Sequence, residues 1–181
     1  MDDAIGGLPA IRFDGSDNFM TFDASMIVGV SYTIFVVEQR RGNSSTINHF
    51  LGGTTASTYN NLHLGYHNST TLRFGHYSYD VDYTVAAYTI PIPRMHSFRF
   101  SITAGKSYWL NGGTSTDAAN ASQTTALSSY GGSALGRAIF GSAYYFNGDI
   151  AELIIFTRDL KTEERQAVET YLGKKYNITI T

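Results

Sequence analysis

Polar and aromatic side chains are densest between Tyr59 and Tyr83. Recognition of a sugar needs planar rings against the C–H faces of the pyranose, together with amide, carboxylate or guanidinium groups for its hydroxyls. This segment supplies both kinds of group and therefore predicts a glycan-binding face. Ordinary cross-strand pairs on a solvated sheet are the alternative, because tyrosine and threonine are favoured there without any ligand. The predicted binding residues of the segment are His63, His67, Arg73, Tyr77, Tyr79, Asp80 and Asp82.

Alternation predicts how four of these side chains meet. His63 and His67 alternate with core side chains along one expected strand, and Arg73 and Tyr77 do so along the next. If the two strands pair as a hairpin, all four side chains share one outward or concave surface. Residues four apart on a strand are separated by about 13 Å, so the two histidines are not expected to bind one metal ion together.

Asp80 and Asp82 follow the second of these strands. Two carboxylates with backbone carbonyls nearby predict a calcium site, and calcium is the one cofactor that we expect. The alternative is a turn in which each aspartate satisfies its own backbone. Trp109, the only tryptophan, precedes the hairpin signal Asn111-Gly112 and is predicted as a further stacking platform, with packing in the core or at the rim as its alternative.

Length and composition predict one soluble globular domain over residues 1–181. The chain has 43% hydrophobic and 15% charged residues, which suits a sizeable core. Its longest apolar runs span four residues, which excludes a membrane-spanning helix. A net charge of -2 without a basic block argues against nucleic acid as a partner. The absence of cysteine excludes disulfides, thiolate nucleophiles and cysteine metal sites.

The first seven residues lack the basic start and the apolar stretch of a signal peptide. We expect either a protein that is not secreted by that route or a domain cut from a longer chain.

Short strand-like segments bounded by turn residues predict an all-β sandwich or barrel, with no helical pattern before residue 160. After it, Thr162 is the expected N-cap of one short amphipathic helix that buries Ala167, Val168, Tyr171 and Leu172. About ten strands are expected, over residues 10–13, 19–22, 32–39, 49–51, 61–67, 71–77, 97–103, 106–110, 138–140 and 148–156.

Several segments together resemble a laminin G-like domain of the concanavalin A-like lectin/glucanase superfamily, in its bacterial and viral branch. They are residues 13–18 (FDGSDN), 32–37 (YTIFVV), 108–112 (YWLNG), 146–160 (FNGDIAELIIFTRDL) and 164–172 (ERQAVETYL). The resemblance implies a two-sheet antiparallel jelly-roll sandwich with one short C-terminal helix. Members of the superfamily bind sugars, glycosaminoglycans or proteins, hydrolyse glycans, or act as structural modules, so the fold leaves the function open.

Glycanases of this superfamily carry carboxylates two or three positions apart on one strand. Glu38 is the only acid on its expected strand, and Asp149 and Glu152, three positions apart, are expected on opposite faces of theirs. We therefore predict no enzymatic activity and assign no catalytic residues.

The prediction is a non-catalytic recognition module of an extracellular, cell-surface or virion protein, with a glycan or glycoprotein as partner. The alternative is a structural or assembly module that packs against further copies or neighbouring domains, for example in a fibre. A glycan hydrolase is the third and least supported reading, because the paired acids are missing.

Overall fold

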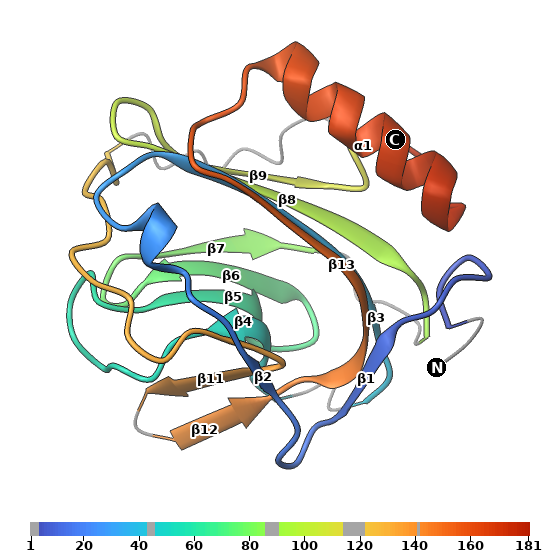
Figure 1. The fold of residues 1–181 in the computed structure, drawn as a ribbon, viewed down its shortest axis with the longest axis horizontal. Helices are drawn as coiled ribbons and strands as arrows, with labels where there is room; N and C mark the ends of the chain where they lie inside the picture. The colour runs from blue at the N-terminus through green and yellow to red at the C-terminus, as the bar shows by residue number, and fades with distance from the viewer. Residues whose placement is uncertain (1–3, 43–45, 86–90, 114–121, 141) are drawn as a thin grey trace.

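Two antiparallel sheets pack face to face in the computed structural model, which describes residues 4–42, 46–85, 91–113, 122–140 and 142–181 (Figure 1). The first sheet has the order β1 (Ile11–Asp14), β13 (Asn147–Phe156), β3 (Tyr32–Arg40), β8 (Arg94–Ser101) and β9 (Gly105–Leu110). The second has the order β2 (Met20–Thr21), β10 (Ala134–Leu135), β4 (Asn48–Gly52), β5 (Leu62–Tyr66), β6 (Thr71–His76) and β7 (Asp80–Thr84). A separate hairpin, β11 (Arg137–Phe140) and β12 (Ser142–Tyr145), lies against β4.

The predicted all-β sandwich with one C-terminal helix is confirmed. Strands β7, β10 and β12 were not expected. Among the described residues before residue 160, the helical structure is one 3-10 turn, η1 (Ser25–Ile27). Asp80 and Asp82 thus lie on an edge strand and not in a turn. Alternation along β7 places Val81 and Tyr83 in the core and turns both aspartates outward.

Strand β3 lies in the middle of the first sheet and is buried along its whole length. Ile34 and Val36 face the second sheet, whereas Phe35 and Val37 face the helix. Covering on both sides explains why this strand reads as a continuous apolar run.

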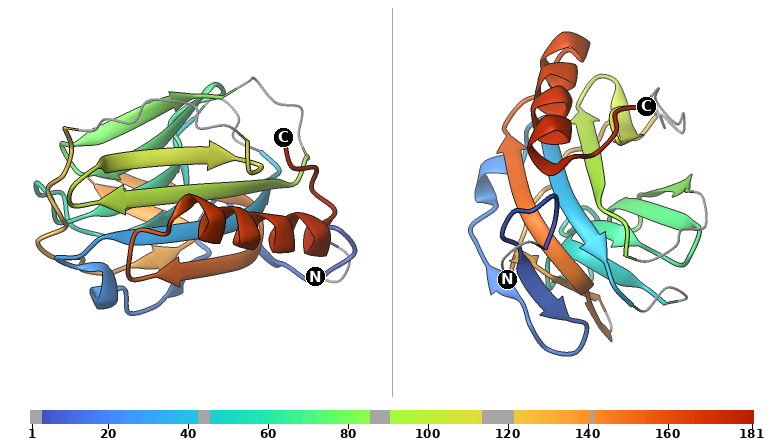
Figure 2. Two further views of the ribbon diagram at one scale, coloured as in Figure 1. Left: turned by 90° about the horizontal axis from the view of Figure 1, so that it is seen from above. Right: turned by 90° about the vertical axis from the view of Figure 1, so that its right-hand side faces the viewer.

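Helix α1 (Thr162–Tyr176) lies across the outer face of the first sheet (Figure 2). Its N-cap is Lys161, one residue before the expected Thr162, and the Glu164 carboxylate accepts a hydrogen bond from the Lys161 backbone N–H at 2.9 Å. Among the described residues, no helix has the length and apolar character required to cross a membrane.

The expected buried face of α1 is wrong for Ala167 and Tyr171, which are exposed. Arg165 and Glu169 occupy that face as a buried ion pair, and Glu169 also accepts a hydrogen bond from Ser97 Oγ at 2.7 Å. The paired charges replace the apolar stripe, so apolar periodicity alone missed the orientation of the helix.

A polar network lies inside the sandwich. Glu38 Oε1 accepts a hydrogen bond from Tyr66 Oη at 2.8 Å and lies 2.9 Å from His96 Nε2. The other ring nitrogen of His96 lies 2.9 Å from Tyr108 Oη. Glu38 and His96 are both fully buried, so this carboxylate has no access to an external substrate.

A β-bulge at Ala151 corrects one sequence prediction. Asp149 pairs with Gln39 and Glu152 with Val37, so the extra residue brings both carboxylates to the same outer face of β13. Asp149 binds Arg12 and Arg41, and Glu152 binds Lys175 and Tyr176. Both acids are therefore engaged in ion pairs that fix the N-terminal strand and the helix.

Candidate functional site

The outer face of the second sheet carries four of the eight predicted binding residues in two cross-strand rows. The first row runs His49, Gly65, Arg73 and Asp82 across β4, β5, β6 and β7, and the second runs His63, Gly75 and Asp80 across β5, β6 and β7. We call the charged part of these rows, Arg73, Asp80 and Asp82, the charged ladder.

The arginine of the charged ladder is held by both acids. Arg73 Nε and Nη2 donate to the two oxygens of Asp82, each at 2.8 Å, and Arg73 Nη1 lies 3.2 Å from Asp80 Oδ2. The hydrogen bonds to Asp82 raise the pKa of Arg73. Burial alone would raise the pKa of Asp80, but His63, Arg73 and Lys106 together lower it below its ordinary value.

His63 reaches the ladder across a glycine. Its Nε2 lies 3.2 Å from Asp80 Oδ1, and the ring occupies the space that a Cβ at Gly75 would fill. Its Nδ1 is buried without a hydrogen-bond partner, although the side chain is only 1% exposed. A buried polar atom without a partner is rare in folded proteins.

His49 lies beside His63 and has no partner at either ring nitrogen. Burial, together with the positive charge near it, holds the pKa of His49 well below its usual range, so the ring is neutral at physiological pH. A neutral imidazole offers one donor and one acceptor, which is the pairing that a hydroxyl group makes.

Three half-buried rings border the charged ladder and cover the two histidines. Phe140 is the centre of this ring layer, with centroids 4.8 Å from Tyr144 and 6.1 Å from Tyr77. Phe140 also packs on His63 at 4.8 Å and on His49 at 5.5 Å. Phe140 and Tyr144 come from the β11–β12 hairpin, so this hairpin and the sheet form the site together.

The hairpin is anchored to the sheet by its backbone. Ile139 N–H donates to the carbonyl of Gly53 at 2.8 Å, and Asn61 Nδ2 donates to the carbonyl of Ile139 at 3.3 Å. Ala138 occupies the position above Gly52 where a Cβ would otherwise lie. These contacts hold Phe140 over the histidines.

Tyr77 enters the ring layer from a strained turn. Tyr77 and Ser78 connect β6 to β7 with φ values of 31° and 69°, a region that bulky residues rarely adopt. Lys106 supports this hairpin from inside the sandwich, because its buried Nζ donates to the carbonyl of Tyr79 at 2.6 Å.

Three predicted binding residues, His67, Tyr79 and Trp109, lie outside the ring layer and the charged ladder. His67 is in the turn after β5, where burial lowers its pKa and Arg73 is its largest charged influence. Tyr79 lies at the end of the β6–β7 hairpin and stacks on Tyr59 with centroids 4.2 Å apart. Trp109 does not join the group. It lies on β9 in the first sheet, where the Arg165 guanidinium is 4.1 Å from the centroid of its ring. Trp109 therefore packs against the helix, in agreement with the alternative of a packing role.

Calcium at Asp80 and Asp82 stays a prediction. The Arg73 guanidinium occupies the space between the two carboxylates, so calcium would have to displace it. Within the described ranges, no group of three or more acidic, histidine or cysteine side chains is arranged to hold a metal ion.

Sequence reasoning missed His49, Phe140 and Tyr144. His49 begins an expected strand and could have been found from alternation, which places it on the outer face of the sheet with His63. Phe140 and Tyr144 lie more than sixty residues after the end of β6. No local pattern indicates that their hairpin folds over β4 and β5.

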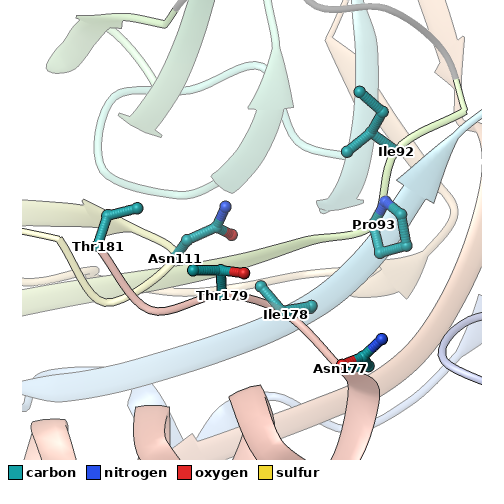
Figure 3. Close-up of a pocket in the computed structure, with 7 residues that line it drawn as sticks. All are labelled: Ile92, Pro93, Asn111, Asn177, Ile178, Thr179 and Thr181. Atoms are coloured by element: carbon teal, nitrogen blue, oxygen red, sulfur yellow. The ribbon is translucent and has the colours of Figure 1, made fainter.

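A separate pocket of about 300 Å³ lies at the ends of β8 and β9, beside the C-terminal tail (Figure 3). It contains none of the predicted binding residues. The described part of its lining is Ile92, Pro93, Asn111, Asn177, Ile178, Thr179 and Thr181.

The sequence matches no known family model and no curated protein. The fold is nevertheless similar to solved structures. The CBM40 of the Ruminococcus gnavus IT-sialidase superimposes with a TM-score of 0.63 at 16% identity, over 89% of this chain and 98% of that one. That CBM40 is also known bound to α2,3- and α2,6-sialyllactose.

Two further structures are similar. The heptameric SAP-like pentraxin of Limulus polyphemus has a TM-score of 0.61 at 16% identity, over 88% of this chain and 81% of that one. A Trypanosoma rangeli sialidase has a TM-score of 0.70 at 11% identity, over 93% of this chain but only 28% of that enzyme. At these identities the likeness concerns the fold alone, which is a two-sheet antiparallel jelly-roll sandwich.

Proposed function

We propose that this chain is a non-catalytic glycan-binding module, of the laminin G-like type, and that its ligand binds on the outer face of the second sheet. The observation that carries the proposal is the ring layer of Tyr77, Phe140 and Tyr144 next to the charged ladder. Rings supply the apolar surface for the C–H faces of a sugar, and the carboxylates accept its hydroxyls.

The acids of the chain support a binding role over hydrolysis. Glycoside hydrolysis needs two carboxyl groups on either side of one bond, one of them protonated. Asp80 and Asp82 are both paired with Arg73, and burial removes Glu38 from any substrate. The fold similarity to a carbohydrate-binding module points in the same direction. We place the module on an extracellular, cell-surface or virion protein, where glycans and glycoproteins are met.

The test is a glycan array probed with the wild type and two variant pairs, in calcium and in chelator. Arg73→Ala breaks the charged ladder. Its matched control is Arg158→Ala, which removes a guanidinium that makes a bidentate ion pair with Glu164 of α1. Phe140→Ala removes the central ring, and exposed Tyr171→Ala is its control. Binding should be lost in Arg73→Ala and Phe140→Ala only. Equal loss in the controls, or no binding by the wild type, would contradict the proposal.

An assembly module is the second candidate, favoured by apolar side chains at one edge of each sheet. Ile11 on β1 is 45% exposed and Met20 on β2 is 48% exposed, and both strands are edges. An unprotected apolar edge suits pairing with a second copy. Light scattering that shows a stable oligomer, lost on Met20→Lys, would favour this function, and a monomer at high concentration would count against it.

A further inference from the structure

We infer that the outer face of the second sheet selects glycans without acidic groups. This inference rests on the proposed function and adds the charge class of the ligand. It is carried by the engagement of Arg73, the only guanidinium of the charged ladder, and by the acceptor oxygens that the two aspartates leave open.

Arg73 directs three of its five N–H donors to the two aspartates. Nε and Nη2 are used by Asp82, and Nη1 is directed to Asp80. The arginine side chain is 19% exposed, whereas that of Asp82 is 41% exposed. A ligand that approaches this face therefore meets carboxylate oxygens before it meets the guanidinium.

The other cations of the chain are placed elsewhere. All thirteen lysines and arginines lie in the described residues. Between the sheets lie Arg40, Arg94 and Lys106, and around Asp149 lie Arg12 and Arg41. On, before or beneath α1 lie Arg99, Arg158, Lys161, Arg165, Lys174 and Lys175. Arg137 packs on the ring of Phe19. Two carboxylates against one guanidinium leave the charged ladder with one excess negative charge.

His49, beside the ladder, adds no positive charge to this face. Burial lowers its pKa far below physiological pH, so the ring is neutral and lacks the positive charge that a carboxylate or sulfate needs. His49 and His63 lie buried under the ring layer, so a ligand on this face contacts the rings and the ladder and not the imidazoles.

The test pairs each neutral oligosaccharide of an array with its sialylated or sulfated form, with lactose and its α2,3- and α2,6-sialyllactose forms included. We expect the wild type to bind neutral members at least about ten-fold more tightly than their acidic forms, because like charges repel. Binding to neutral glycans should also change little with salt concentration.

Asp82→Ala gives the opposite expectation. It frees Nε and Nη2 of Arg73, so the ratio of acidic to neutral binding should rise by about ten-fold. Glu163→Gln, an exposed acid in the first turn of α1, removes the same net charge and should leave the ratio unchanged.

The outcomes separate the two proposals. Binding of acidic members in preference to neutral ones by the wild type would overturn this inference and leave the glycan-binding function standing. No binding to any glycan would overturn both. A ratio that shifts equally in Asp82→Ala and Glu163→Gln would show that net charge, and not the engagement of Arg73, sets the preference, and would also overturn it.

Discussion

Two histidine–carboxylate pairs in this molecule have the same chemistry and different surroundings. His96 and Glu38 lie between the sheets, and His96 uses both ring nitrogens, one toward Glu38 and one toward Tyr108. His63 and Asp80 lie on the outer face, where Nε2 of His63 approaches Asp80 without a hydrogen bond, Nδ1 has no partner, and Asp80 is 26% exposed. The inner pair leaves only Glu38 Oε2 without a hydrogen-bond partner and is closed off between the sheets, whereas the outer pair includes a partly exposed carboxylate that a ligand can reach.

Loss of the inner carboxylate should have the largest effect on stability. Glu38→Ala leaves His96 and Tyr66 buried without their shared acceptor, so we expect the free energy of unfolding to fall by about 3–5 kcal/mol. Urea denaturation measures this change. Asp82→Ala, which breaks a partly exposed pair, should cost about 1 kcal/mol or less. Similar losses in the two variants would remove the distinction between the inner and outer regions.

Lys106 connects the two regions and predicts a pH dependence. Burial lowers its pKa to about 7 from the ordinary value of 10.5. Between these values the unfolded chain binds a proton that the folded chain lacks, so stability should rise with pH by at most about 1.4 kcal/mol per unit across this window. Urea denaturation between about pH 7 and pH 10 should show this rise in the wild type and a flatter curve in Lys106→Met. Parallel curves would contradict the prediction.

Substitution of two glycines on the outer face, Gly75 and Gly65, should distinguish an effect on glycan affinity from an effect on the stability of the fold. At Gly75 a Cβ would meet only the ends of the His63 and Asp80 side chains, so Gly75→Ala should cost about 1 kcal/mol in stability. By displacing that pair it should weaken glycan binding about ten-fold, the equivalent of one hydrogen bond.

Gly65→Ala is the comparison for that variant. Gly65 has φ +150° and faces the backbone of His49, so a methyl group there should cost about 1–3 kcal/mol in unfolding free energy. Calorimetry of glycan binding and thermal denaturation of both variants measure the two effects. A Gly75→Ala variant that binds normally would place the ligand away from His63.

The sequence predicts the fold well where side chains alternate in or out of one core. Along β5 and β6, alternation places His63 and Arg73 on the outer face, as the structure has them. Prediction from the sequence fails where opposite charges on neighbouring strands form ion pairs. Strand β7 was not expected, and aspartate is depleted in strands, but Arg73 on the neighbouring strand forms ion pairs with Asp80 and Asp82.

The remaining misses have similar physical causes. The bulge at Ala151 inserts one residue, which changes the face of Glu152 and leaves no mark in the local pattern. The buried face of α1 contains the Arg165–Glu169 pair over Trp109, where periodicity expects apolar side chains. The ring layer depends on a long-range contact of the β11–β12 hairpin, which no local rule predicts.

Calcium should produce the smallest effect and would sharpen the description of the outer pair. Calcium requires six to eight oxygen ligands, and at Asp80 and Asp82 it competes with the guanidinium of Arg73. Removal of that competitor should increase affinity, so calcium should raise the thermal midpoint of Arg73→Ala more than that of the wild type. At a calcium concentration equal to the dissociation constant, the gain is about 0.4 kcal/mol. Thermal denaturation in calcium and in chelator measures it, and Asp80→Asn/Asp82→Asn should abolish it. Equal shifts of the thermal midpoint in the wild type, Arg73→Ala and Asp80→Asn/Asp82→Asn would show that calcium binds elsewhere. Asp80 and Asp82 would then interact with Arg73 and the glycan only.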